Sequence, residues 1–170
     1  MLSIQTILHP TDYSEYSEYA FRLSCSLARD YGAHLVLLHV ITGPRLIGGE
    51  DPVACKIIDE FLDQQQQKLE GLRPADPKLK VTRQLAQGDP ALEILRVARE
   101  INCDMIVMGT HGLTGVKRLL MGSVAEGVTR EARCPVVIVR TPFPRGEMPF
   151  GSPVGKAEEA HHSAVREENT

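Results

Sequence analysis

The chain has 170 residues, of which 42% are apolar and 24% are charged, and its formal net charge at pH 7 is -3. This is the balance of a globular domain that can bury a core, and it lacks the basic excess of a nucleic-acid-binding protein. The four scattered cysteines, the lack of a long apolar run and a start without a basic region favour a cytoplasmic protein with no membrane contact.

Five short runs predict the strands of one sheet. Four of them are almost wholly apolar, which is typical of strands covered on both faces in a parallel sheet. The fifth alternates more between apolar and polar residues, and this favours a place at an edge of the sheet. In chain order the runs are residues 4–8, 35–41, 79–85 (the alternating run), 105–108 and 136–139.

Helical patterns fill the stretches between these runs. Asp89 and Pro90 precede the third pattern as an N-cap and a first-turn proline. Strands that alternate with helices predict an α/β fold, here a single doubly wound, five-stranded parallel sheet with helices on both faces, as in Rossmann-like folds. With the alternating strand at the edge, the strand order is 3-2-1-4-5. The four helical stripes begin at Tyr16, Ile58, Ala91 and Val124.

This strand order predicts where a ligand binds. Strands 1 and 4 are neighbours whose connections leave in opposite directions, and ligands of such sheets bind in the crevice beyond the carboxyl ends of those strands. The two connections at that position are residues 9–14 after strand 1 and residues 109–123 after strand 4.

One domain is expected over residues 1–141, followed by a tail over residues 142–170. The tail carries prolines and then a charged stretch, and it lacks the apolar residues for a core of its own. We therefore expect it to be flexible or loosely docked. Its composition does not separate a partner-binding arm from a solubilising segment.

The connection after strand 4 has a pattern that suits phosphate. Gly109 and Gly112 lie near its start, and the pair Gly122-Ser123 lies where the last helix begins. Glycines let a ligand approach the backbone N–H groups closely, and a helix N-terminus adds unpaired donors and partial positive charge. The spacing is neither that of a P-loop nor that of the G-x-G-x-x-G dinucleotide fingerprint.

This spacing, Gly109-x2-Gly112-x9-Gly122-Ser123, resembles the nucleotide-binding motif of the universal stress protein family in its ATP-binding branch. The resemblance extends over about residues 3–140 and includes the start ILHPTDYSEYSEYAF and the ending CPVVIVR. It implies a fold of the adenine nucleotide alpha hydrolase type and a regulatory or stress-response role with ATP or AMP bound. Whether Mg²⁺ accompanies the nucleotide stays open.

The resemblance also implies roles for single residues. Pro10, Thr11 and Asp12 match the tip of strand 1 that contacts the nucleoside, and Val40 matches the position whose backbone contacts the adenine edge. His111, inside the loop, is a candidate phosphate contact. The ribose and phosphate positions are matched by Met108, Gly109, Gly112, Gly122, Ser123 and Val124.

The last strand is the expected homodimer interface. In the family this strand pairs with its copy from a second subunit, and the resemblance carries that role to the run from Val136 to Arg140. An apolar strand at the edge of a sheet also needs to be covered, and self-pairing covers it.

Structural explanations stay open for several of these residues. Asp12 and Glu15 could form a capping box, although Ser14 could cap the same helix. The glycine loop could be a surface Ω-loop without a ligand, but connections of this length are more often functional. His9 and His39 could approach each other at neighbouring strand ends, yet two histidines alone are weak evidence for zinc.

Three functions have to be separated. The first is a regulatory protein that binds an adenine nucleotide, and the second is a slow ATP hydrolase in which Asp12 and Ser123 lie near Mg²⁺. No Walker-type lysine or arginine finger supports efficient hydrolysis. The third is a dimeric interaction module without a nucleotide, and the intact glycine–serine set argues against it.

Overall fold

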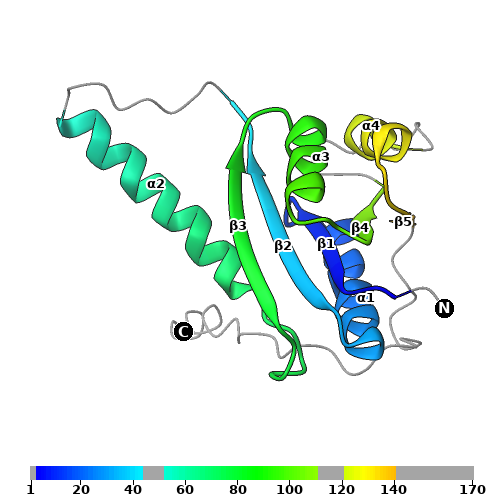
Figure 1. The fold of residues 1–170 in the computed structure, drawn as a ribbon. Helices are drawn as coiled ribbons and strands as arrows, with labels where there is room; N and C mark the ends of the chain where they lie inside the picture. Colours follow the sequence, from blue (N-terminus) through cyan, green and yellow to red (C-terminus); the bar gives the residue numbers. More distant parts are fainter. Residues whose placement is uncertain (1–2, 44–51, 111–120, 141–170) are drawn as a thin grey trace, which may run out of the picture.

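The computed structural model describes residues 3–43, 52–110 and 121–140 of the chain. In these residues strands and helices alternate from the first strand to the last (Figure 1). The elements are β1 (Thr6–Thr11), α1 (Glu15–Tyr31), β2 (His34–Ile41), α2 (Pro52–Gly71), β3 (Val81–Gln87), α3 (Pro90–Glu100), β4 (Met105–Gly109), α4 (Ser123–Glu131) and β5 (Val136–Val139).

The five strands form one parallel sheet in the order β3-β2-β1-β4-β5. The predicted order and the edge position of the third strand are confirmed. The third strand was predicted over residues 79–85, but β3 begins at Val81 and ends at Gln87, two residues later at each end. Its pairing with β2 continues as far as Ile41.

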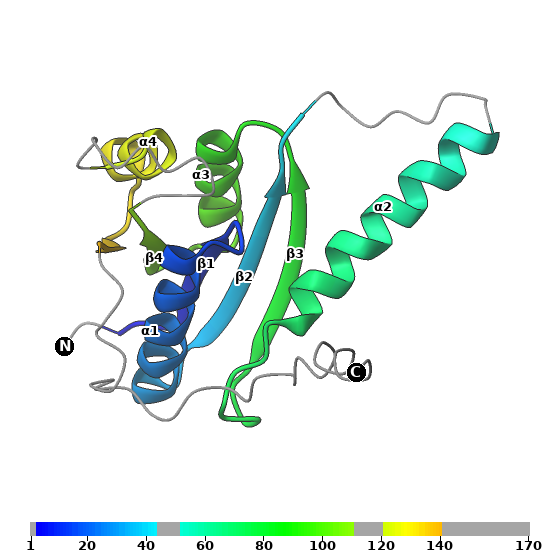
Figure 2. The ribbon, with the colours of Figure 1, turned by 180° about the vertical axis from the view of Figure 1, so that it is seen from behind.

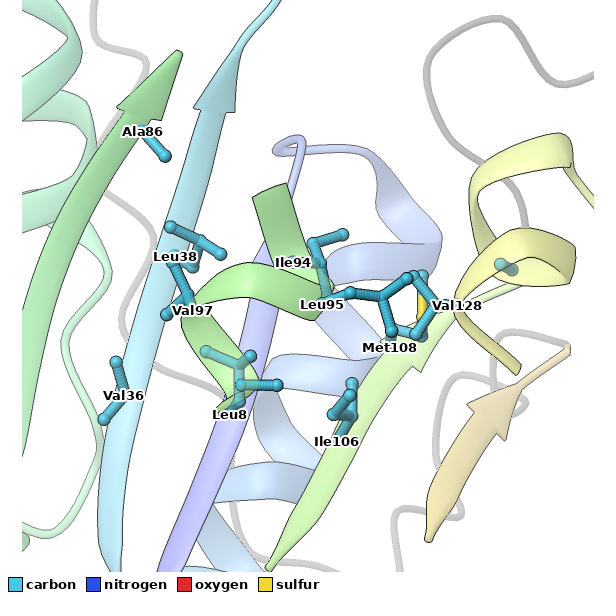
Figure 3. Close-up of a cluster of buried hydrophobic side chains, with 12 residues drawn as sticks. Leu8, Val36, Leu38, Ala86, Ile94, Leu95, Val97, Ile106, Met108 and Val128 are labelled. Carbon is cyan, nitrogen blue, oxygen red and sulfur yellow. The ribbon is translucent and has the colours of Figure 1, made fainter. Parts of the chain in front are cut away.

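Helices cover both faces of this sheet, as predicted (Figures 1 and 2). Leu8, Ile106 and Val128 belong to a buried cluster between the sheet and the α3–α4 layer (Figure 3). Ile7, Phe21 and other residues form a second cluster between the sheet and the α1–α2 layer. Neighbouring residues of β1 thus alternate between the two cores, which explains why the run is apolar throughout.

The first strand is longer than its apolar run. It was expected to end at Leu8, but it continues through His9 and Pro10 to Thr11. The extension is held by β2, since the pairing between β1 and β2 runs to Thr11 and His39. The sequence pattern missed it because His9 and Thr11 are polar, although both are buried.

The starts of α1 and α3 have defined caps. Ser14 is the N-cap of α1 and accepts a hydrogen bond from the backbone N–H of Ser17, so the capping box from Asp12 is wrong. Asp89 caps α3 by accepting from the N–H of Leu92, and Pro90 follows as predicted. Capping of this kind stabilises a helix by roughly 1 kcal/mol.

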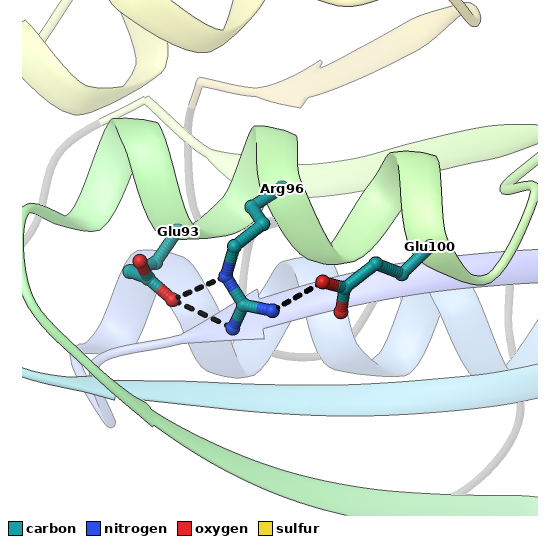
Figure 4. A network of polar contacts seen from close by, with 3 residues as sticks. All are labelled: Glu93, Arg96 and Glu100. Atoms are coloured by element: carbon teal, nitrogen blue, oxygen red, sulfur yellow. Dashed lines mark hydrogen bonds and ion pairs between the residues drawn. The ribbon is translucent and has the colours of Figure 1, made fainter.

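Helix α3 also carries an ion-pair network on its surface. Arg96 donates to Glu93 at 2.7 and 2.9 Å and to Glu100 at 2.6 Å (Figure 4). These charge-assisted bonds raise the pKa of Arg96 above its usual value. Because the three side chains join successive turns of one helix and are partly exposed to solvent, their contribution to stability is small.

Helix α2 is held mainly at its C-terminal end. Leu69 is fully buried there, and Arg83 of β3 donates to the backbone carbonyls of Leu69 and Leu72 at 3.1 and 2.7 Å. The N-terminal half exposes Val53 and Ile57. No helix in the described part of the chain is long and apolar enough to cross a membrane.

Candidate functional site

The backbone pairing between β1 and β4 ends near the position where a ligand was predicted. The two strands pair at Ile7 and Leu8 of β1, and that pairing stops before Pro10. Proline has no N–H to donate to a neighbouring strand. The carbonyl of Val107 on β4 instead accepts a hydrogen bond from Nδ1 of His9 at 2.9 Å. The imidazole thus joins β1 to β4 where the backbone ladder has ended.

His9 is a neutral, buried member of this junction. Its side chain has no exposed surface, and its ring lies 5.8 Å from that of Phe21 in α1. Burial lowers the pKa of His9 to about 4, against the raising effects of the bond to Val107 and of the Asp12 charge. Nε2 of His9 has no hydrogen-bond partner among the described residues.

A tight turn connects β1 to α1. Oδ1 of Asp12 accepts hydrogen bonds from the backbone N–H of Ser14 at 3.1 Å and from its hydroxyl at 2.6 Å. The hydroxyl of Thr11 accepts from Tyr13 N at 3.1 Å and from the Ser17 hydroxyl at 2.8 Å. These bonds fix the direction in which the Asp12 carboxylate leaves the end of β1.

Tyr13 has a strained backbone at the centre of this turn. Its φ is 64°, in the left-handed region that non-glycine residues rarely adopt. The ring packs against that of His39 with centroids 4.6 Å apart, and burial raises the pKa of Tyr13 to about 12. Nδ1 of His39 donates to the Thr11 carbonyl at 2.8 Å, which fixes both rings at the ends of β1 and β2.

Strand β2 extends past its pairing with β1. The last β1 partner is His39, whereas β3 pairs with β2 as far as Ile41. The backbone of Val40 therefore has an edge on the β1 side that borders the turn at Asp12. The side chain of Val40 packs on the same core cluster as Met108, Met121 and Val124.

Gly109 ends β4 against the first turn of α1. A Cβ atom at this position would lie 2.9 Å from Cβ, 3.0 Å from the carbonyl carbon and 3.1 Å from the carbonyl oxygen of Tyr16. The last two atoms belong to the backbone and cannot rotate away. Packing therefore explains this glycine without any ligand.

Thr110 fixes both ends of the following connection. It is fully buried, its N–H donates to the Val139 carbonyl at 3.0 Å, and its hydroxyl donates to the same carbonyl at 3.3 Å. Its own carbonyl accepts from the N–H of Gly122 at 2.8 Å. The end of β4, the end of β5 and the start of α4 are joined through this one residue.

Helix α4 begins without a side-chain cap. Gly122 is the N-cap, with φ -73° and ψ 154°, and it offers no side-chain oxygen to the first turn. The first backbone bond of the helix runs from Glu126 N to Gly122 O. The N–H groups of Ser123, Val124 and Ala125 therefore lack acceptors within the helix, and such groups are the donors that bind anions. Ser123 is exposed beside them.

The structure thus places the described candidate residues at the end of the sheet where the carboxyl ends of the strands lie. Pro10, Thr11 and Asp12 end β1, Val40 lies near the end of β2, and the remaining described candidates flank the connection from β4 to α4. Pro10 and the side chain of Met108 are buried, so contacts of Met108 with a ligand would come from its backbone. His111 and Gly112 lie outside the described residues.

Sequence reasoning missed three residues that shape this end of the sheet. Thr110 and Ser17 are buried polar residues, and the signal for Thr110 was its place directly after an apolar strand. The left-handed backbone of Tyr13 had no signal, because the residue is neither glycine nor asparagine. His9 and His39 were weighed as a pair, but each ring bonds to a different backbone carbonyl.

Comparison with known proteins gives a consistent result. The family model described as the universal stress protein family matches residues 3–140. Universal stress protein MJ0531 of Methanocaldococcus jannaschii is 33% identical over 139 residues, which are 80% of this chain and 82% of that protein.

Solved structures share the fold. The structure of hypothetical protein MJ0577, from the same organism, has a TM-score of 0.72 and 30% identity, and the match covers 83% of this chain and 99% of that one. A universal stress protein from Archaeoglobus fulgidus, solved in complex with dAMP, has a TM-score of 0.51 and 20% identity, with 82% and 99% covered. At that identity the second match shows the fold alone.

Proposed function

Because the chain belongs to the universal stress protein family, we propose that it binds an adenine nucleotide at the carboxyl ends of β1, β2 and β4. The observation that carries this proposal is the uncapped start of α4, which lies beside the end of β4 and is tied to it by Thr110. The A. fulgidus protein, which has the same fold, binds dAMP, so the fold can accommodate a ligand of this class.

The phosphates bind at the start of α4. The three N–H groups after Gly122 lack acceptors within the helix, and the helix dipole favours negative charge at that end. The exposed hydroxyl of Ser123 adds a donor. Neither Asp nor Glu occurs in the run from Gly109 to Ser123, so no carboxylate of the connection repels the phosphates.

The nucleoside binds at the other side of the crevice. Asp12 leaves β1 in a direction fixed by Ser14, and a carboxylate accepts hydrogen bonds from a ribose hydroxyl or an adenine amine. The backbone edge of Val40 lies past the end of β1, where it can pair with the adenine ring. Hydrogen bonds to a charged group of this kind contribute about 1.5–3 kcal/mol each.

Nucleotide occupancy then has a regulatory role. A ligand bound across β1, β2 and α4 joins parts of the chain that are otherwise connected through Thr110 and His9.

The test is to purify the protein without added nucleotide, denature it and identify the released small molecules by mass spectrometry. The emptied protein is then titrated with ATP and with AMP in a calorimeter. We expect one adenine nucleotide per chain, and weaker binding by Asp12→Asn, which keeps the side-chain shape but lowers its charge. The proposal is wrong if the extract is empty and neither nucleotide gives heat.

We also propose that β5 forms a homodimer interface. Val136, Val137 and Ile138 are half-exposed, and β5 lies at an edge of the sheet. A charge at Val137 should shift the mass measured by analytical ultracentrifugation toward that of a monomer, because charged residues block strand pairing. Thr82→Lys, on the opposite edge strand, is the matched control and should leave the mass unchanged. A monomeric parent protein would contradict the proposal.

A further inference from the structure

A cavity lies at the other end of the sheet from the proposed nucleotide site. Its volume is about 350 Å³, within the size range of small-ligand sites. It is bounded by the C-terminal ends of α3 and α4 and by the turns that lead into β4 and β5. Leu95 and Ala98 of α3 line its apolar side.

Two cysteines meet in this cavity. Cys103 lies two residues before β4 and Cys134 two residues before β5, and these strands pair in parallel from Ile106 and Val136 onward. Both cysteines line the cavity, both are half-buried, and each thiol lies close enough to affect the pKa of the other. Cys103 also donates to the Met105 carbonyl at 3.0 Å, which directs its sulfur.

The surroundings do not favour a reactive thiol at either position. Burial raises the pKa of both thiols, that of Cys103 to about 12, with the Cys134 charge a further cause. Such thiols are poor nucleophiles and slow to oxidise. A cation between two sulfurs removes the repulsion that opposes their joint ionisation, and a coordinated thiol loses its proton outright.

The charge at the cavity mouth fits the same occupant. Arg99 and Arg133 line the cavity, and neither forms an ion pair with another described residue, whereas Glu131 lies 3.6 Å from Arg130. A complex of two thiolates with one monovalent cation has a charge of -1. Arg99 and Arg133 supply positive charge at the cavity, against the carboxylate of Asp104, whose charge also acts on Cys134.

We propose that Cys103 and Cys134 form a two-coordinate site for a soft monovalent cation of the Cu(I) type. Thiolates are the ligands that select Cu(I), and the paired turns bring two of them together. The described residues contain no group of three or more such ligands. On binding, each sulfur forms one bond to the metal and releases one proton to solvent, and no electron is transferred. Residues 103–134 are thereby closed into a ring that contains β4 and α4.

The test is an anaerobic titration of the full chain with Cu(I), kept reduced by ascorbate and in competition with bathocuproine disulfonate. We expect one chelator-resistant Cu(I) per chain and its loss in Cys103→Ala and in Cys134→Ala. Cys25→Ala and Cys55→Ala, in α1 and α2, are the matched controls and should keep it. Circular dichroism of each variant establishes that it is folded.

X-ray absorption of the loaded protein supplies a second measurement. We expect two sulfur neighbours at the metal in the parent protein. The proposal is overturned if the parent holds no chelator-resistant copper, if the double variant Cys103→Ala/Cys134→Ala retains it, or if oxygen or nitrogen replaces sulfur as the neighbour.

Discussion

Gly109 and Gly122 flank the same connection, yet the structure gives them different physical reasons. At Gly109 a side chain would collide with the backbone of Tyr16, so the fold itself requires glycine. Gly122 has an ordinary extended backbone and caps α4 without a side-chain oxygen, leaving helix N–H groups for another acceptor. The exit from β4 is thus fixed by packing, whereas no described side chain caps the start of α4.

The largest effect should come from His9, whose ring bonds to the carbonyl of Val107 in β4, two residues before Gly109. In the unfolded chain the histidine has its usual pKa of 6.5, whereas burial lowers the pKa of His9 to about 4 in the folded protein. Between pH 6.5 and pH 4 the unfolded state binds more protons than the folded state. The free energy of unfolding therefore keeps its full value above pH 6.5 and falls as the pH drops toward 4. We expect His9 to account for a loss of about 3 kcal/mol.

Urea unfolding at several pH values measures this loss. The variant His9→Asn keeps an N–H close to the position of Nδ1 and does not titrate, so its pH dependence should be smaller by that amount. Parallel curves for the two proteins would show that another group causes the acid sensitivity.

The next effect tests packing at Gly109. Gly109→Ala should lower the free energy of unfolding by about 2 kcal/mol, because the added methyl group meets backbone atoms that cannot move aside. Gly71→Ala is the control, since a Cβ there meets no atom within 4 Å. Urea denaturation of both variants gives the comparison, and equal stabilities would contradict a steric requirement at Gly109.

The opposite result is expected at Gly122. Gly122→Val should weaken nucleotide binding at least about tenfold, which is 1.4 kcal/mol, because a branched side chain blocks the approach to the helix N–H groups. Its φ of -73° suits valine, so the free energy of unfolding without ligand should change by less than about 1 kcal/mol. Calorimetric titration with ATP measures the first quantity and urea denaturation the second. Unchanged affinity would place the phosphates elsewhere.

The same contrast shows what the sequence could predict. The apolar runs of β2, β4 and β5 identified strands, and the alternation near Val81 identified an edge strand. Both predictions were possible because a strand buried on two faces is apolar throughout, whereas a strand buried on one face alternates between apolar and polar residues. The strand order also predicted where a ligand should bind. These predictions needed no side-chain contact.

Other features depend on contacts between distant residues and left no local signal. The extension of β1 rests on pairing with β2, and the role of Gly109 rests on Tyr16, more than ninety residues earlier. The glycine pattern placed both Gly109 and Gly122 in one phosphate motif. The separate reasons appear when the packing around each is known.

The smallest effect concerns Thr110, which joins the two sides of the comparison. Thr110→Val keeps the shape of the side chain and both backbone bonds, and it removes the hydroxyl bond to the Val139 carbonyl. Because that carbonyl still accepts from the Thr110 N–H, we expect the free energy of unfolding to fall by about 1 kcal/mol or less. The hydroxyl also approaches the Arg140 carbonyl at 3.5 Å, so hydrogen exchange should quicken at the end of β5 and not in β2. A faster exchange throughout the sheet would mean that Thr110 supports the whole fold rather than the junction of β4, β5 and α4.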